Sequence, residues 1–149
     1  MKKAAPHFSR RASVRTKEGG TIAVPDTGAV LRCDPDGTHL ELFAWGLRNP
    51  QSLIFNENGD LLTGDNDCDR SDEERLVHVV EHGDSGWRIG YQFAPLGNAG
   101  PWNSEKMWQP RHPGQAAAII PAICNIEDGP SGLAYYPGTG LNFSYAGSI

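Results

Sequence analysis

The chain has 149 residues, of which 38% are hydrophobic and 21% charged, proportions that suit an ordinary soluble domain with one core. Its net charge of −5 lacks the basic excess of nucleic-acid-binding proteins, so we expect no nucleic-acid partner. The longest apolar run, residues 116–121, is too short for a transmembrane segment. The 18 glycines and 11 prolines are typical of short strands joined by many turns, and therefore favour an all-β fold.

Residues 1–20 show little hydrophobic pattern, and we expect them to be irregular. The opening MKKAAPHFSRR has the positive charge of a signal peptide but not the apolar segment of about 7–15 residues that must follow it. Either the protein is not exported or its true beginning lies upstream.

Cys33, Cys68 and Cys124 form no CxxC pair. The sequence is therefore compatible both with one disulfide and with three unpaired thiols.

From residue 28 the chain alternates between apolar and polar positions, and turn sequences separate the alternating segments. Asp34-Pro35-Asp36-Gly37 is a strong turn signal, and the Asn56–Gly59 segment is a second. Each turn therefore predicts a hairpin between its flanking segments. The strands expected in this region cover residues 29–33, 39–44, 51–55, 60–64, 74–80 and 87–91.

Residues 94–122 interrupt this rhythm, with a short helix expected at 104–108. So long a loop is either a functional excursion or packs through its aromatic side chains. Residues 130–135 then repeat the Pro-led apolar pattern of residues 50–55, as blade repeats do. We therefore expect residues 21–149 to form two to three blades of a β-propeller. Its parts are an outer hairpin (28–45), a full blade (46–92), an insertion (93–122) and the start of a next blade (123–149).

An incomplete ring of this kind leaves strand edges exposed, so we expect the isolated piece to associate or to fold incompletely.

Two groups of polar residues lie on its expected loops. Arg48 precedes a strand, where its forked guanidinium suits a ligand that carries carboxylates, and Asn49 can add an amide contact. The alternative is that Arg48 only ties its loop to a backbone carbonyl or a neighbouring carboxylate.

The second group is an acidic loop that follows the strand at 60–64. Asp65, Asp67 and Asp69 alternate as in the first half of an EF-hand loop, but Arg70 replaces the required glycine, so an EF-hand is excluded. The sequence leaves open a Ca²⁺ site of another kind or a loop that is solvated or salt-bridged to Arg70 and Arg75. The full set of expected metal ligands is Asp65, Asp67, Asp69, Asp72 and Glu73.

The order of these motifs resembles the glucose/sorbosone dehydrogenase family, six-bladed propellers that use pyrroloquinoline quinone (PQQ) with calcium. The segments that carry the resemblance include GLRNPQSL at 46–53, DE at 72–73 and GDSGW at 83–87. With DND at 65–67 and GPSGL at 129–133, the chain looks closer still to the "putative membrane-bound dehydrogenase" propellers of planctomycete-type bacteria. The resemblance covers about residues 20–149.

The resemblance implies that Arg48 and Asn49 contact the PQQ carboxylates and that Asp72 and Glu73 lie near calcium. It further implies sugar or alcohol oxidation outside the cytoplasm, in the periplasm or extracellularly, with a cytochrome c-type domain as electron acceptor. Asp65-Asn66-Asp67 stands where the family offers a Gly-Pro backbone pair to calcium. Two alternatives therefore remain, a cofactor-free propeller that serves as a binding module and a calcium-dependent lactonase-like hydrolase. No residue is assigned as the catalytic base.

Overall fold

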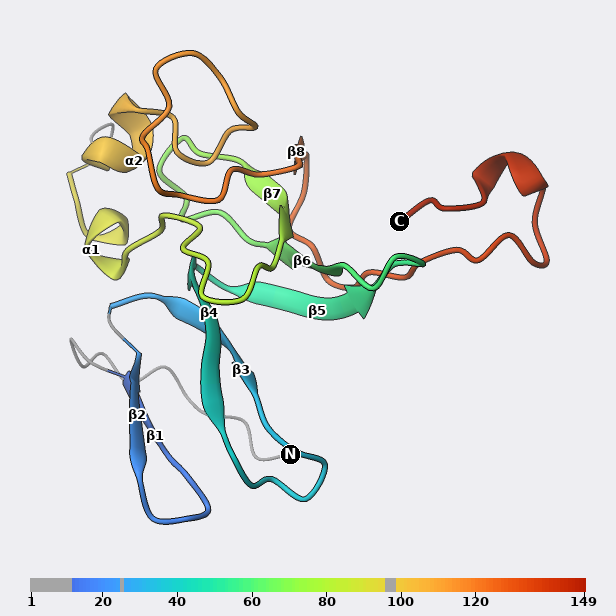
Figure 1. Cartoon of the computed structure of the whole chain (residues 1–149). Helices are drawn as coiled ribbons and strands as arrows, with labels where there is room; N and C mark the ends of the chain where they lie inside the picture. Colours follow the sequence, from blue (N-terminus) through green and yellow to red (C-terminus); the bar gives the residue numbers. More distant parts are fainter. Residues whose placement is uncertain (1–11, 25, 96–98) are drawn as a thin grey trace.

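The computed structural model describes residues 12–24, 26–95 and 99–149. Within them the chain forms three antiparallel sheets, two of two strands and one of four, with only short helices (Figure 1). The all-β expectation is confirmed, while the sheets are small and do not close into a ring. The elements are β1 (Ala12–Arg15), β2 (Thr21–Val24), β3 (Gly28–Arg32), β4 (Glu41–Leu47), β5 (Pro50–Phe55), β6 (Leu61–Asp65), β7 (Glu74–His78), α1 (Ile89–Gln92), α2 (Pro101–Ser104), β8 (Cys124–Ile126) and the 3₁₀ helix η1 (Phe143–Tyr145).

Two of the expected hairpins form where their turn residues lie. β3 and β4 are joined by a turn in which Gly37 donates its N–H to the Asp34 carbonyl at 2.8 Å. β5 and β6 flank a turn in which the Asn56 side-chain oxygen accepts the N–H groups of Asn58 and Asp60, at 3.0 and 2.8 Å. Asn and Asp stabilise turns through such local bonds, which is why the sequence located both hairpins.

The expectation of an irregular segment over residues 1–20 is wrong for its described part. β1 and β2 form a hairpin in register Arg15↔Thr21, and Thr16 closes its turn by accepting the N–H of Gly19 at 3.1 Å. Each of these strands has only four residues, so its apolar pattern is too short to be recognised in the sequence. Residues 1–11 lie outside the described residues.

The fourth strand expected at residues 87–91 does not form, because α1 occupies most of that segment. Its alternating apolar side chains pack against the insertion instead, as the stacking of Tyr91 on Trp102 at 6.0 Å between ring centroids shows. The free edge of β7 pairs with β8 in register Leu76↔Cys124. The insertion therefore separates the third and fourth strands of one sheet, whose order is β5-β6-β7-β8.

Residues 127–149 form an arm that first runs along the four-stranded sheet, where Pro130 lies against Gly64, and then projects from the body of the molecule (red in Figure 1). The strand that the repeat at residues 130–135 predicts is absent from this described segment, which contains only η1. A strand needs a neighbouring backbone to pair with, and here Tyr136 instead exchanges backbone bonds with Gly147 and Ser148 within the arm. The helix expected at 104–108 does not form there, because α2 covers Pro101–Ser104 and residues 105–108 form turns. The helix starts at Pro101, since the fixed φ of proline suits a first helical position.

Two apolar clusters form the core. One lies between the β3–β4 hairpin and the four-stranded sheet and consists of Val30, Ala44, Leu47, Val77 and Val79. The other packs the insertion against the loops that follow β6 and β7, and it consists of Cys68, Trp87, Ala99, Trp102, Met107 and Trp108. The insertion thus packs through its aromatic side chains, one of the two alternatives that its length suggested. No helix among the described residues is long and apolar enough to cross a membrane.

Candidate functional site

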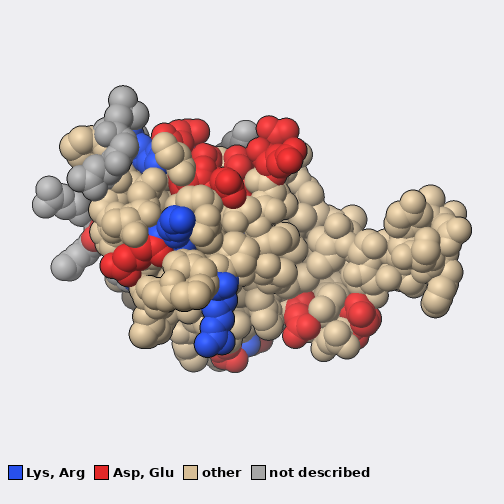
Figure 2. Space-filling model, turned by 90° about the horizontal axis from the view of Figure 1, so that it is seen from above, with Lys and Arg blue, Asp and Glu red and all other residues tan. Residues whose placement is uncertain are grey.

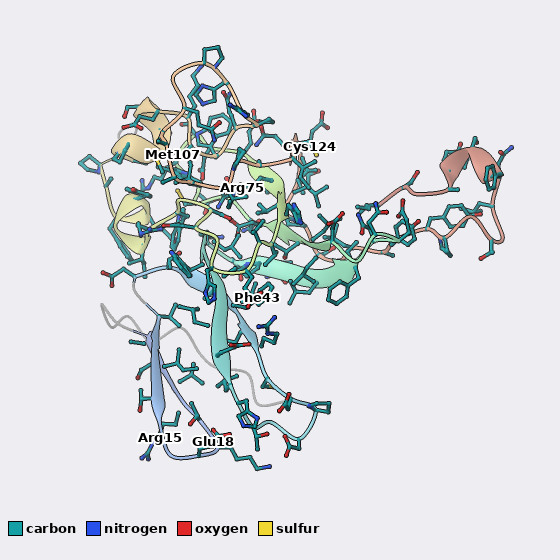
Figure 3. The ribbon with its side chains drawn as sticks, viewed as in Figure 1. Arg15, Glu18, Phe43, Arg75, Met107 and Cys124 are labelled. Carbon is teal, nitrogen blue, oxygen red and sulfur yellow. The ribbon has the colours of Figure 1, made fainter. Side chains whose placement is uncertain are left out.

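A fully buried ion pair lies at the centre of the fold. Arg75 of β7 and Asp65 of β6 face each other in the sheet register, and both side chains are only 1% exposed. The Arg75 guanidinium donates from Nη2 and Nε to Asp65 Oδ2, at 2.8 and 3.1 Å. It also lies 4.7 Å from the centre of the Trp102 ring, in the interior of the molecule (Figure 3). A charge in such a position persists only when it is paired and hydrogen-bonded.

The same pair fixes two loops around it. Arg75 donates to the backbone carbonyls of Ser85 and Gly46, at 2.7 and 2.9 Å. Asp65 Oδ1 accepts the backbone N–H groups of Arg48 and Asn49, both at 2.9 Å. One pair of side chains therefore holds the loop at Ser85, the end of β4 at Gly46 and the turn between β4 and β5, whose backbone is fixed.

This turn presents the two residues expected to hold a cofactor. The Arg48 side chain is 16% exposed, and among the described residues its ion-pair partner is Asp69, whose Oδ2 lies 3.9 Å from Nη2. That distance is too long for a hydrogen bond, and Asp69 is itself 83% exposed. Asn49 is exposed. Arg48 is therefore near a neighbouring carboxylate, as the alternative interpretation expected, but at a distance beyond hydrogen bonding.

In the acidic loop Asp72 organises the backbone. Its Oδ2 accepts the Cys68 N–H at 3.0 Å and the Trp102 indole N–H at 2.7 Å, and its Oδ1 accepts the Arg70 N–H at 3.1 Å. Asp72 is 8% exposed, so these three donors satisfy a buried carboxylate. Arg70 donates in turn to the Gln92 carbonyl at 2.7 Å. Asp72 thus joins the loop to the insertion.

Three of the five expected metal ligands remain nearer the surface. Asp69 and Glu73 are exposed, and Asp67 is half-buried. Burial, followed by the charges of Asp72 and Glu74, raises the pKa of Asp67 to about 6. Among the described residues, no three His, Cys, Asp or Glu side chains converge in a way that could hold a metal ion.

The raised pKa of Asp67 predicts a pH-dependent effect of Asp67→Asn. Because the folded state binds this proton more tightly than the unfolded state, the ionised carboxylate destabilises the fold increasingly between pH 4 and 6. Asp67→Asn should therefore raise the free energy of unfolding above pH 6, by no more than about 1 kcal/mol given solvent screening, and leave it unchanged below pH 4. Urea unfolding across this range measures the difference, with the exposed Asp128→Asn as control. An equal gain at pH 4 would contradict this cause.

All three cysteines are free thiols, with Cys33 and Cys124 exposed and Cys68 buried. Burial raises the pKa of Cys68 to about 12, and the nearby Asp72 carboxylate acts in the same direction. We expect Cys33 and Cys124 to react readily with an aromatic disulfide reagent at pH 8, and Cys68 to react only after unfolding. Counting the released thiolate with and without denaturant measures this. Prompt reaction of all three in the native state would show that the Cys68 cluster opens.

Comparison with protein-family models, curated proteins and solved structures gave no match.

Sequence reasoning missed the central role of Arg75 and of Trp102. One alternative for the acidic loop was that it is salt-bridged to Arg70 and Arg75. The Arg75 part is confirmed by its pair with Asp65, whereas Arg70 binds the Gln92 carbonyl. The sequence did contain an indication of the role of Arg75. Arg75, Val77 and Val79 occupy every second position of an alternating strand, so Arg75 lies on the same buried face as the two valines. The contact with Trp102 had no such signal, since the fold of the insertion brings it there.

Figure 2 shows the charged side chains on one face of the molecule. Asp and Glu lie in several separate groups, and the Lys and Arg side chains between them are few. Several pairs satisfy each other locally, such as Arg88 with Asp84 four residues earlier. The charges on this face are therefore scattered. Within the described part of the chain, the charged side chains with the most hydrogen bonds are the buried pair of Arg75 with Asp65.

Proposed function

We propose that the chain contributes the cofactor-anchoring wall of a quinoprotein-type dehydrogenase, built from propeller blades and acting outside the cytoplasm on a sugar or alcohol. The observation that carries the proposal is the Arg48 turn. Its backbone is fixed by the buried Asp65 carboxylate, while the ion-pair contact of its guanidinium within residues 12–24, 26–95 and 99–149 is the long one with the exposed Asp69. A preorganised arginine of this kind binds carboxylates at little conformational cost.

PQQ fits this turn through its carboxylates, which Arg48 would hold from the guanidinium and Asn49 from its side-chain amide. Bound PQQ supplies the quinone that accepts two electrons from the substrate. The role of the chain is to orient this group, and electrons would leave for a cytochrome c-type domain. The buried pair of Asp65 with Arg75 supports this role indirectly, because it holds the turn in place.

Calcium does not fit the five expected carboxylates as they stand. Asp65 and Asp72 already accept hydrogen bonds from buried donors, and a cation would have to displace Arg75 or the Trp102 indole. The remaining three, Asp67, Asp69 and Glu73, would have to bind calcium without them. We therefore place no step of the reaction on calcium in this segment.

The engagement of Asp65 and Asp72 by buried donors favours a second candidate, a cofactor-free blade segment that serves as a binding module. In that case Arg48 recognises a carboxylate on a peptide or small molecule, and the acidic loop is purely structural. The two candidates share the arginine and differ in the ligand.

Calorimetric titration of the full chain with PQQ distinguishes them. We expect wild-type protein to bind PQQ equally with Ca²⁺ and with EGTA, and Arg48→Ala to weaken binding by about 10-fold or more, since a hydrogen bond to a charged group contributes about 1.5–3 kcal/mol. Arg32→Ala is the matched control, because Arg32 is 50% exposed and paired with Glu41 and Glu81.

Binding that is unaffected by Arg48→Ala would remove the anchor from the proposal. An absence of binding at millimolar PQQ would leave the binding module as the better candidate. Dye reduction with PQQ and a panel of sugars and alcohols tests turnover separately, because anchoring and chemistry depend on different residues.

A further inference from the structure

An open apolar groove lies between β3 and β5. These strands contact each other without pairing and then diverge (Figure 1). The groove has a volume of about 640 Å³, and its lining includes Leu53 and Phe55, which are 50% and 65% exposed. It also includes Val30 and Val79 of the core cluster beneath the β3–β4 hairpin, so the groove continues an established interface between sheets.

The borders of the groove are strands with one free edge each. Among the described residues β3 pairs only with β4, and β5 only with β6. Unpaired strand edges beside an apolar surface are templates for a further strand. The complement of such a groove is an extended segment of about five residues that has apolar side chains at alternate positions.

The arm carries a segment of this description. Leu141, Phe143 and Tyr145 alternate with Asn142 and Ser144, and the three apolar side chains are 68%, 81% and 58% exposed. Residues 129–149 contain no Asp, Glu, Lys, Arg or His, so the arm itself would bring no charge into the groove. The groove lining also includes Arg32, Asp60, His78 and Glu81, which are paired with each other as Arg32–Glu81 and His78–Asp60 and remain about half exposed. The segment has five residues, as β3 does, while β5 has six.

We propose that two copies of this chain associate by exchanging arms, with residues 141–145 of each copy extended in the β3–β5 groove of the other. Each copy offers one arm and one groove, so a two-fold axis closes the pair with two identical contacts. The gain is burial of exposed Leu and Phe side chains on both partners. The change required is unwinding of η1, a single 3₁₀ turn of three residues, together with opening of the backbone bonds that Tyr136 makes with Gly147 and Ser148. This association does not depend on the proposed dehydrogenase function.

Sedimentation of the full 149-residue chain tests the proposal with two variants. Phe55→Glu disables the groove and keeps the arm, and Phe143→Glu disables the arm and keeps the groove. Both side chains are mostly exposed, so each variant should keep the wild-type circular dichroism and thermal midpoint. We expect wild-type protein to form dimers as its concentration rises into the micromolar range, and each variant alone to remain monomeric.

An equimolar mixture of the two variants gives the decisive measurement. The arm of Phe55→Glu fits the groove of Phe143→Glu, so the mixture should regain a dimer with one intact contact and a dissociation constant weaker than wild type. Ile123→Glu, which removes a 49% exposed side chain outside both regions, should leave dimerisation unchanged. The proposal is overturned if wild-type protein stays monomeric at 200 µM, if Phe143→Glu dimerises as wild type does, or if the mixture stays monomeric.

Discussion

Replacing Arg75 with alanine is expected to lower the free energy of unfolding by about 3–5 kcal/mol, because it leaves a buried carboxylate without its partner. Asp65 is 1% exposed and would retain only the two backbone donors of the β4–β5 turn. The loss is a large part of the stability of a typical domain, about 5–15 kcal/mol. Urea unfolding monitored by tryptophan fluorescence measures it, since Trp102 lies over the Arg75 guanidinium.

Two further variants isolate the cause of this loss. Arg32→Ala removes an arginine from half-exposed ion pairs with Glu41 and Glu81 and should cost far less than Arg75→Ala, because solvent screens these pairs. The double variant Arg75→Ala with Asp65→Ala should be more stable than the sum of the single losses predicts, because no charge is then left unpaired. Additive losses would show that the two side chains act independently, contrary to their geometry.

The second large effect is expected at Gly46, where Gly46→Ala should reduce the free energy of unfolding by at least about 3 kcal/mol. Gly46 has φ +81°, and a Cβ there would lie 2.2 Å from Asp84 Oδ1 and 2.3 Å from the Ser85 nitrogen. Its carbonyl also accepts from Arg75 at 2.9 Å, so a shift of this backbone disturbs the buried pair as well. Thermal and urea unfolding provide the measurement.

Gly59→Ala is the matched control for this substitution. Gly59 has nearly the same φ, +83°, yet a Cβ there has nothing within 4 Å. Its cost should be that of a left-handed conformation alone, about 1–2 kcal/mol. Equal losses at the two glycines would mean that the loop beside Gly46 moves away freely.

The sequence indicated the hairpins well because their strands and turns are local. Gly37 and Gly59 close two turns of the expected kind, and β7 lies within the segment expected from its alternation. Prediction from the sequence failed where a strand pairs with a segment that is distant along the chain. β8 has only three residues and pairs because the edge of β7 is available, and no local pattern marks that choice.

In the candidate site too, the sequence predicted local neighbours but not contacts between distant residues. Sequence alone placed Arg48, Asn49 and the acidic loop next to each other, and the structure has them on adjacent turns. It did not separate the carboxylates that hold the fold, Asp65 and Asp72, from those that remain near the surface. That distinction depends on which donors surround each side chain, and for Asp72 one of them is an indole thirty residues away.

The insertion between β7 and β8 has a consequence for how this chain can vary in length. Trp102 covers Arg75 and satisfies Asp72, so the half of the insertion around α2 belongs to the same folding unit as the sheet. The following loop, residues 111–118, is mostly exposed and contributes no residue to either apolar cluster. Lengthening or shortening is therefore tolerable at 111–118 and disruptive near Trp102, although both lie in one irregular stretch of sequence.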